Sequence, residues 1–125
     1  YVVGTNDEIN ILGGSEKVDL SLKKIFHIIK NGVVVHKLGK RGCRIYDINS
    51  NKSKIVTVKS FKSTVVNAQG AGDSFLMISA LSIAANSSLW EAAYLGMIAS
   101  AIQVSSVGNI PIAKNKIVEV IDLLN

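Results

Sequence analysis

Apolar and polar residues along the first half of the chain follow the spacings of alternating strands and helices. Residues 1–4 are apolar, as at the end of a buried strand. Asn6, Asp7 and Glu8 then open a short acidic helix that stops at Gly13-Gly14. Across residues 19–30, apolar side chains recur every three or four positions with lysines between them, which predicts an amphipathic helix. Residues 32–38 are rich in valine, which favours a strand.

After residue 38, two further strands are followed by a run of helices. A glycine-containing turn at 39–42 separates the valine-rich run from expected strands at 43–47 and 55–58. Three helices should follow, over 74–85, from Leu89 onward and over 114–124. The first of these is apolar nearly all round, so we expect it to be covered on several sides. The fold class is therefore α/β, a partial sheet flanked by helices.

Composition indicates a single packed domain over residues 1–125. Hydrophobic residues make up 48% of the sequence, and this length has room for one domain. The chain starts with Tyr1 inside an apolar run, so we interpret it as part of a longer protein. Its one cysteine, Cys43, excludes an internal disulfide and a multi-cysteine metal site. It carries no secretory signal, which favours a cytoplasmic protein.

The net charge of +5 is concentrated in one region of the chain. Residues 17–62 hold twelve of the fourteen lysines and arginines and only two acids. Such a region attracts phosphates, on a small molecule or on nucleic acid, unless it is simply a solvated surface. Its aromatic residues are too scattered to interleave with the cations, so we expect no nucleic-acid partner.

A membrane span is the alternative for residues 92–113, which carry no charge and are long enough to cross a bilayer. The second half of this stretch contains glutamine, serines, glycine, asparagine and proline, which are poor lipid-facing residues. We therefore expect a buried helix followed by a loop, and no membrane partner.

The segment Gly70-Ala71-Gly72-Asp73 lies where the strand-rich half gives way to an apolar helix. Two glycines around a small residue allow a sharp turn that presents consecutive N–H groups, and such groups at a helix N-terminus bind phosphate oxygens. Asp73 then has two interpretations. It either offsets the helix dipole, or it takes a proton from an attacking hydroxyl in phosphoryl transfer. The residues alone leave both open.

Residues 70–75 resemble the C-terminal signature of the ribokinase-like (PfkB) sugar kinases. Residues 33–43 are similar to the family's strand and Leu-Gly-x-x-Gly loop beside the nucleotide, and residues 6–8 resemble its Asn/Glu motif. Segments 90–93 and 101–109 look closest to heptose-phosphate kinases. The resemblance covers the whole chain but only the C-terminal half of a ribokinase-like fold, so the N-terminal sugar-binding half is absent.

The resemblance implies a carbohydrate kinase that uses ATP and Mg²⁺ to phosphorylate a hydroxyl of a sugar or sugar phosphate. It implies that Asp73 is the general base and that the amides of Gly70, Ala71 and Gly72 form the anion hole. Asn6 and Glu8 would position metal and phosphates. The residues implied to bind nucleotide are Lys37, Gly39, Lys40, Gly42, Gly96, Met97 and Asn109. Solvent exposure remains the alternative for the two lysines, and packing or capping for the last three residues.

The chain departs from the family pattern at two places. Asn67 stands where the family usually has Asp, and Ala68 and Gln69 stand where Thr is common, which disfavours potassium activation. Glu8 follows Asn6 by two residues instead of three, so a simple helix N-terminus is the alternative for this acid. These departures favour a second hypothesis, a non-catalytic nucleotide-binding domain on a decayed kinase scaffold.

The chain alone should be inactive or nearly so, because the sugar-binding half is missing. A homo-oligomer is compatible with the family. His27 and His36 show no partner pattern, so we interpret both as structural or surface residues.

Overall fold

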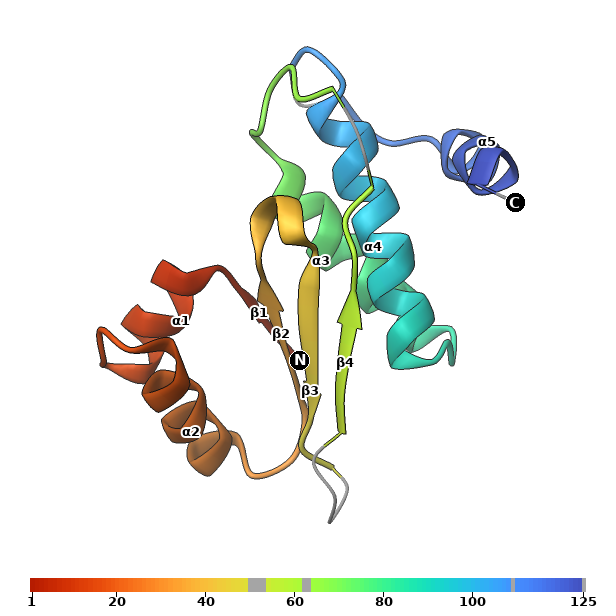
Figure 1. Cartoon of the computed structure of the whole chain (residues 1–125). Helices are drawn as coiled ribbons and strands as arrows, with labels where there is room; N and C mark the ends of the chain where they lie inside the picture. The colour runs from red at the N-terminus through yellow and green to blue at the C-terminus, as the bar shows by residue number, and fades with distance from the viewer. Residues whose placement is uncertain (50–53, 62–63, 109, 125) are drawn as a thin grey trace. The chain divides into compact units, whose positions relative to one another are not determined.

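The structure is a computed structural model that describes residues 1–49, 54–61, 64–108 and 110–124 (Figure 1). The chain contains two compact units, residues Tyr1–Lys59 and Ser60–Asn125. We call these unit 1 and unit 2 and describe each by itself.

Unit 1 is a four-stranded sheet with two helices on one of its sides (Figure 1). The strands lie in the order β1 (Val2–Gly4), β2 (Val33–Lys37), β3 (Cys43–Asp47) and β4 (Lys54–Val58). β1 and β2 are parallel, and the other two pairings are antiparallel. Helices α1 (Asn6–Gly13) and α2 (Val18–Ile29) connect β1 to β2, and the 3₁₀ turn η1 (Gly39–Arg41) connects β2 to β3.

The core of unit 1 lies between the sheet and its two helices. Strand alternation directs Val34 of β2 toward the helices, where it packs with Ile9, Leu22 and Ile25. The two helices approach closely at Gly13, since a Cβ placed there would lie 2.4 Å from the Cα of Ser21. The backbone contact therefore requires glycine at this position.

Unit 2 consists of the helices α3 (Ala71–Ala84), α4 (Leu89–Val104) and α5 (Lys114–Leu124). Helices α3 and α4 lie side by side (Figure 1). Their shared core contains Phe75 and Ile98, which are 1% and 0% exposed. Gly96 permits the close approach, because a Cβ on this residue would come within 3.0 Å of the Phe75 ring. A capping box between Ser88 and Glu91 begins α4.

The α/β class and the three C-terminal helices are confirmed. Helix α3 begins at Ala71, earlier than the predicted Ser74, because Gly70 adopts the left-handed conformation and serves as the N-cap. The expectation that this helix is covered on several sides is wrong for the described structure. Its buried residues are Phe75, Ser79 and Ser82, whereas Leu76, Met77 and Leu81 are 44%, 62% and 58% exposed.

The stretch considered as a membrane span consists of most of α4 and the loop that follows it. Within the described ranges, no helix has both the length and the apolar character needed to cross a bilayer. The prediction of a buried helix followed by a loop is confirmed for this stretch, since Ala92, Ala93, Ile98 and Ala99 of α4 are buried.

Candidate functional site

The start of α3 carries the predicted base and anion hole. Gly70 has φ 77° and ψ −7°, and no side chain caps the helix. The amides of Gly70, Gly72 and Asp73 donate to no acceptor in the part of the chain that the structure describes, whereas the Ala71 amide lies 3.5 Å from the Ala68 carbonyl. Asp73 is exposed beside these amides. The helix therefore begins with unused N–H donors next to a carboxylate, an arrangement that suits phosphate oxygens.

Hydrogen bonds to α4 hold this helix start in place. The Ser100 hydroxyl donates to the Ala71 carbonyl at 2.7 Å, and the Asn67 amide donates to the Val104 carbonyl at 3.1 Å. The Asn67 side-chain oxygen accepts from the Gln69 amide at 3.0 Å. Hydrogen bonds to α4 thus hold both ends of the loop that leads into α3. Within this loop, Asn67 acts as a turn residue.

Buried Gln103 extends this network toward the loop after α4. Its side-chain amide donates to the Gly108 carbonyl at 3.0 Å, and its oxygen accepts from the Ser74 hydroxyl at 3.5 Å. Sequence reasoning did not single out Gln103. The sequence feature that could have identified Gln103 is a polar residue within an otherwise apolar helix, because a buried amide needs hydrogen-bond partners.

Gly96 and Met97 belong to α4, and Asn109 lies outside the described residues. Gly96 is buried against Phe75, which gives it a packing role. Met97 is partly buried and lies one helical turn before Ala101. The nucleotide-binding roles implied for all three residues stay predictions.

In unit 1, Asn6, Glu8 and Lys37 come together where the parallel strands β1 and β2 end. The Glu8 carboxylate accepts from the Thr5 amide at 2.7 Å in a capping box and lies 3.7 Å from the Lys37 ammonium. The Thr5 amide, helped by Lys37, holds the pKa of Glu8 below its ordinary value. The structure thus gives Glu8 a capping role, and its role toward phosphate stays a prediction.

His36 is the residue that sequence reasoning missed in this cluster. It is 5% exposed, and its Nε2 lies 2.5 Å from Oδ1 of Asn6. Burial, with Arg44 and Arg41 nearby, lowers its pKa, which favours the neutral ring. Burial excludes a surface position for His36, and its partner Asn6 could not be predicted from the sequence. The sequence feature that could have indicated a buried, hydrogen-bonded side chain is a polar residue inside the valine run of β2.

The loop after β2 contains the remaining predicted residues. Gly39 and Gly42 have φ values of 57° and 92°, which other residues rarely adopt, and the Leu38 amide donates to the Gly42 carbonyl at 2.7 Å. Lys40 and Arg41 are exposed between the glycines. The glycines therefore shape a tight basic turn, while the contacts of this turn with nucleotide stay predictions.

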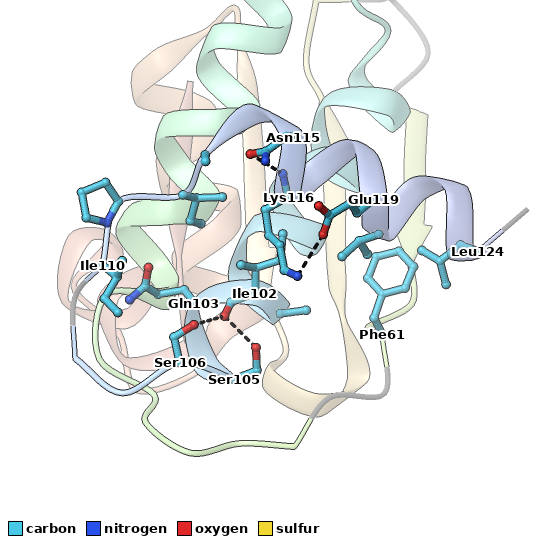
Figure 2. Close-up of a pocket in the computed structure, with 15 residues that line it drawn as sticks. Phe61, Ile102, Gln103, Ser105, Ser106, Ile110, Asn115, Lys116, Glu119 and Leu124 are labelled. Carbon is cyan, nitrogen blue, oxygen red and sulfur yellow. Dashed lines mark hydrogen bonds and ion pairs between the residues drawn. The ribbon is translucent and has the colours of Figure 1, made fainter.

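A groove of about 580 Å³ lies between the end of α4 and α5 in unit 2, and it does not include residues 70–73. Figure 2 shows Ile102 and Ile110 among its apolar side chains, with Ser105 and Ser106 donating to the Ile102 carbonyl. Phe61 also lines the groove. Its volume is in the range of small-molecule sites.

An aromatic stack adjoins the groove. The Phe61 ring meets Tyr94 edge-on, with centroids 5.1 Å apart, and Tyr94 stacks on Trp90 at 4.9 Å. These contacts connect the groove wall to the first turns of α4.

The described residues offer no ready-made metal cluster. No group of three or more His, Cys, Asp or Glu side chains gathers as metal ligands among them. Cys43 is buried, and burial raises its pKa to about 11, so it is a packing residue and not a reactive thiolate.

Several solved structures resemble the chain. The ribokinase from Thermotoga maritima is 26% identical, with a TM-score of 0.81 over 98% of this chain. The ribokinase from Arabidopsis thaliana, complexed with ribose and ATP, is 20% identical, with a TM-score of 0.76 over 94%. The fructokinase from Vibrio cholerae O395, bound to fructose, ADP and calcium ion, is 20% identical, with a TM-score of 0.71 over 86%.

The chain spans 42%, 39% and 35% of the lengths of these three chains, respectively. No curated protein matches it. The similarity confirms the expected partial ribokinase-like fold, in which a mixed sheet is followed by helices. The model of the pfkB family carbohydrate kinases matches residues 1–116, and the chain therefore belongs to that family.

Proposed function

We propose that the protein containing this chain transfers the γ-phosphate of ATP to a hydroxyl of a sugar or sugar phosphate. One observation carries the proposal. In a member of a carbohydrate kinase family, α3 starts at a left-handed glycine. The amides of Gly72 and Asp73 there donate to no acceptor among the described residues, and the Asp73 carboxylate is exposed beside them. Phosphoryl transfer needs little from a protein beyond positioning, charge stabilisation and a base, and this helix start offers the last two.

In the proposed reaction, Asp73 takes the proton of the acceptor hydroxyl. The hydroxyl oxygen then forms a bond to the γ-phosphorus while the bond from phosphorus to the β–γ bridging oxygen breaks, and ADP leaves with that electron pair. The amides of residues 70–72 stabilise negative charge on the transferred group. These amides belong to a backbone segment that is held by the hydrogen bond from Ser100 to the Ala71 carbonyl, so they need little reorganisation during the reaction.

Magnesium is the metal that this chemistry implies. The Asn6 Oδ1 is already bonded to His36, and the Glu8 carboxylate is used by Thr5 and Lys37. These groups fit an ion that is bound mainly by nucleotide phosphates and water, as Mg²⁺ commonly is, with the Glu8 carboxylate nearby. When bound, Mg²⁺ would neutralise charge on the phosphates.

The groove at the end of α4 is our candidate for the nucleotide base. Its walls combine apolar side chains with serine hydroxyls, and Met97 lies one helical turn before Ala101 of the groove. The basic turn at 39–42 is a separate candidate for phosphate contacts, through Lys40.

We further propose that activity requires a longer polypeptide than these 125 residues. The chain spans less than half of the length of each of the three kinases reported above, and α3 exposes the large apolar side chains of Leu76, Met77 and Leu81. Such a face needs a cover in a stable protein. The 125-residue chain assayed alone should therefore show no sugar phosphorylation.

The test compares wild-type and Asp73→Asn forms of the whole protein for ADP release over a panel of sugars and sugar phosphates. Loss of a positioned base costs about 10²–10⁴-fold in kcat, while the affinity for ATP should stay within about threefold, because the amides are retained. Asp122→Asn, an exposed acid on α5, is the matched control and should keep full activity. Equal turnover by wild type and Asp73→Asn would remove the base assignment.

The second candidate is a nucleotide-binding domain that has lost catalysis. The capping role of Glu8 and the turn role of Asn67 favour it, since both residues depart from the family pattern. This candidate predicts ATP binding without turnover of any acceptor in the same panel.

A further inference from the structure

Among the described residues, the His36 ring makes one hydrogen bond and its other nitrogen has no partner. Nε2 lies 2.5 Å from Oδ1 of Asn6, across thirty positions of sequence. Nδ1 is buried and meets no hydrogen-bonding group of the described residues. A buried polar atom without a partner is rare, and it restricts where the proton of this ring can lie.

The two nitrogens together determine where the ring proton lies. An amide oxygen only accepts, so Nε2 must carry the hydrogen that joins it to Asn6. A hydrogen on Nδ1 would be a buried donor without an acceptor, which proteins avoid more strongly than an unused acceptor. Turning the Asn6 amide over would require that same unpaired Nδ1–H, since Nε2 would then accept.

The charged ring is disfavoured as well. An imidazolium would place a charged, unpaired Nδ1–H in a buried position, and Arg44 lies opposite His36 on β3. Arg41 adds positive potential, and Asp19 is the acid that opposes it. The geometry therefore favours a neutral ring with its hydrogen on Nε2.

This hydrogen bond determines which group Asn6 presents to a ligand. Its Oδ1 accepts from His36, so the NH₂ group, on the other side of the planar amide, is left for a ligand. Asn6 is exposed at the first position of α1, where the helix dipole favours anions. Lys37 follows His36 on the same strand, and its ammonium lies 3.7 Å from the Glu8 carboxylate and offsets the charge of that acid beside Asn6. All of these groups belong to unit 1.

We propose that His36 is a positioning residue that fixes the Asn6 amide with its NH₂ group outward, so that Asn6 binds a phosphate oxygen and not a metal ion. The proposal rests on the proposed function for the identity of the phosphate as that of a nucleotide. The orientation of the amide follows from unit 1 alone.

The first measurement is the tautomer of His36 in the ¹⁵N-labelled protein, read from long-range ¹H–¹⁵N correlations of the ring. We expect a neutral ring at pH 7.5 with the hydrogen on Nε2. The exposed His27 provides the internal comparison, and His36→Gln identifies which ring is which. A hydrogen on Nδ1, or a charged ring, would overturn the proposal.

The second measurement follows the Asn6 side-chain NH₂ signal during titration with inorganic tripolyphosphate in the presence of EDTA. We expect this signal to shift with tripolyphosphate and to stay unchanged with MgCl₂ alone. A shift with MgCl₂ alone, or no shift with tripolyphosphate, contradicts the proposal. The signal is assigned by its loss in Asn6→Ala.

The variants separate positioning from a general loss of structure. His36→Leu removes the donor and should weaken tripolyphosphate binding by about threefold to tenfold, the effect of one hydrogen bond. His36→Gln keeps a donor and should remain within about twofold of wild type. In an Asn6→Ala background, His36→Leu should cause no further loss; an additional loss of similar size would mean that His36 does not act through Asn6.

These readouts need no turnover. If the whole protein phosphorylated no acceptor in the panel, the proposed function would fail, and if Asp73→Asn kept full activity, the base assignment would fail; in both cases the tautomer and tripolyphosphate results would still stand. Conversely, a wrong tautomer with intact dependence on Asp73 would overturn only the role of His36.

Discussion

Replacing Gly96 with alanine should loosen the contact that aligns α3 with α4. The added Cβ would lie 3.0 Å from two ring carbons of Phe75 and 3.1 Å from its carbonyl oxygen. Ordinary carbon contacts are about 3.5–4.0 Å, so the overlap is roughly 0.5–1 Å. Phe75 is 1% exposed and has little free space into which its ring can turn.

The size of the effect follows from two opposing contributions. Overpacking a core contact typically costs about 1–3 kcal/mol, and we expect about 2–3 here because both a ring and a backbone atom are in the way. Alanine gains about 1 kcal/mol over glycine in helix propensity. The free energy of unfolding should therefore fall by about 1–2 kcal/mol, which lowers the urea midpoint by roughly 0.5–1 M.

A double-mutant cycle provides the control. Urea unfolding is followed by far-ultraviolet circular dichroism for Gly96→Ala in the wild-type and Phe75→Leu backgrounds. The smaller leucine removes the ring atoms from the contact but keeps the carbonyl oxygen of residue 75, so Gly96→Ala should cost less stability there than in the wild-type background. An equal loss of unfolding free energy in both backgrounds would refute the packing argument. The nucleotide contact implied by the family resemblance would then remain as the role of Gly96.

Three further predictions concern unit 1. Gly13→Ala should unfold more readily than Gly14→Ala, because a Cβ at Gly13 lies 2.4 Å from the Cα of Ser21 whereas one at Gly14 meets nothing within 4 Å and costs only about 1–2 kcal/mol of left-handed strain; equal urea midpoints would contradict this. Cys43, with a pKa of about 11, should resist iodoacetamide at pH 8 until urea unfolds the protein, as measured by mass spectrometry, and rapid labelling of the native protein would contradict its burial. The lowered pKa of Glu8 means that its ionised form stabilises the fold at neutral pH and that this contribution is lost as pH falls through the folded pKa. The stability difference between wild type and Glu8→Gln should therefore shrink below about pH 4, and a difference that grew there would have the wrong sign.

Much of the fold follows from local pattern. The valine run of β2 and the three- and four-residue spacing of α2 predict those elements almost to their observed ends, since burial of one face imposes the period. The start of α3 is less predictable, because Gly70 and Gly72 read as loop residues although the first is a helix cap and the second lies inside the helix. The presence of a glycine does not by itself distinguish a helix cap from a position inside the helix.

The candidate site is predictable only where its residues are neighbours in sequence. Residues 70–73 form one motif, so their meeting at a helix start could be predicted. The pair His36 and Asn6 depends on the register of β1 against β2, in which Gly4 lies opposite His36. No local pattern encodes that register, and the groove at the end of α4 likewise depends on how α5 packs.

The stack of Phe61, Tyr94 and Trp90 gives unit 2 an optical reporter of its own. Trp90 is the single tryptophan of the sequence, and it contacts Tyr94, whose other neighbour Phe61 lines the groove. A ligand that displaces Phe61 changes the surroundings of Tyr94 and, through it, the emission of the indole. Tryptophan fluorescence of the unlabelled protein can therefore report occupancy of the groove, and unit 1, which contains no tryptophan, does not contribute to this signal.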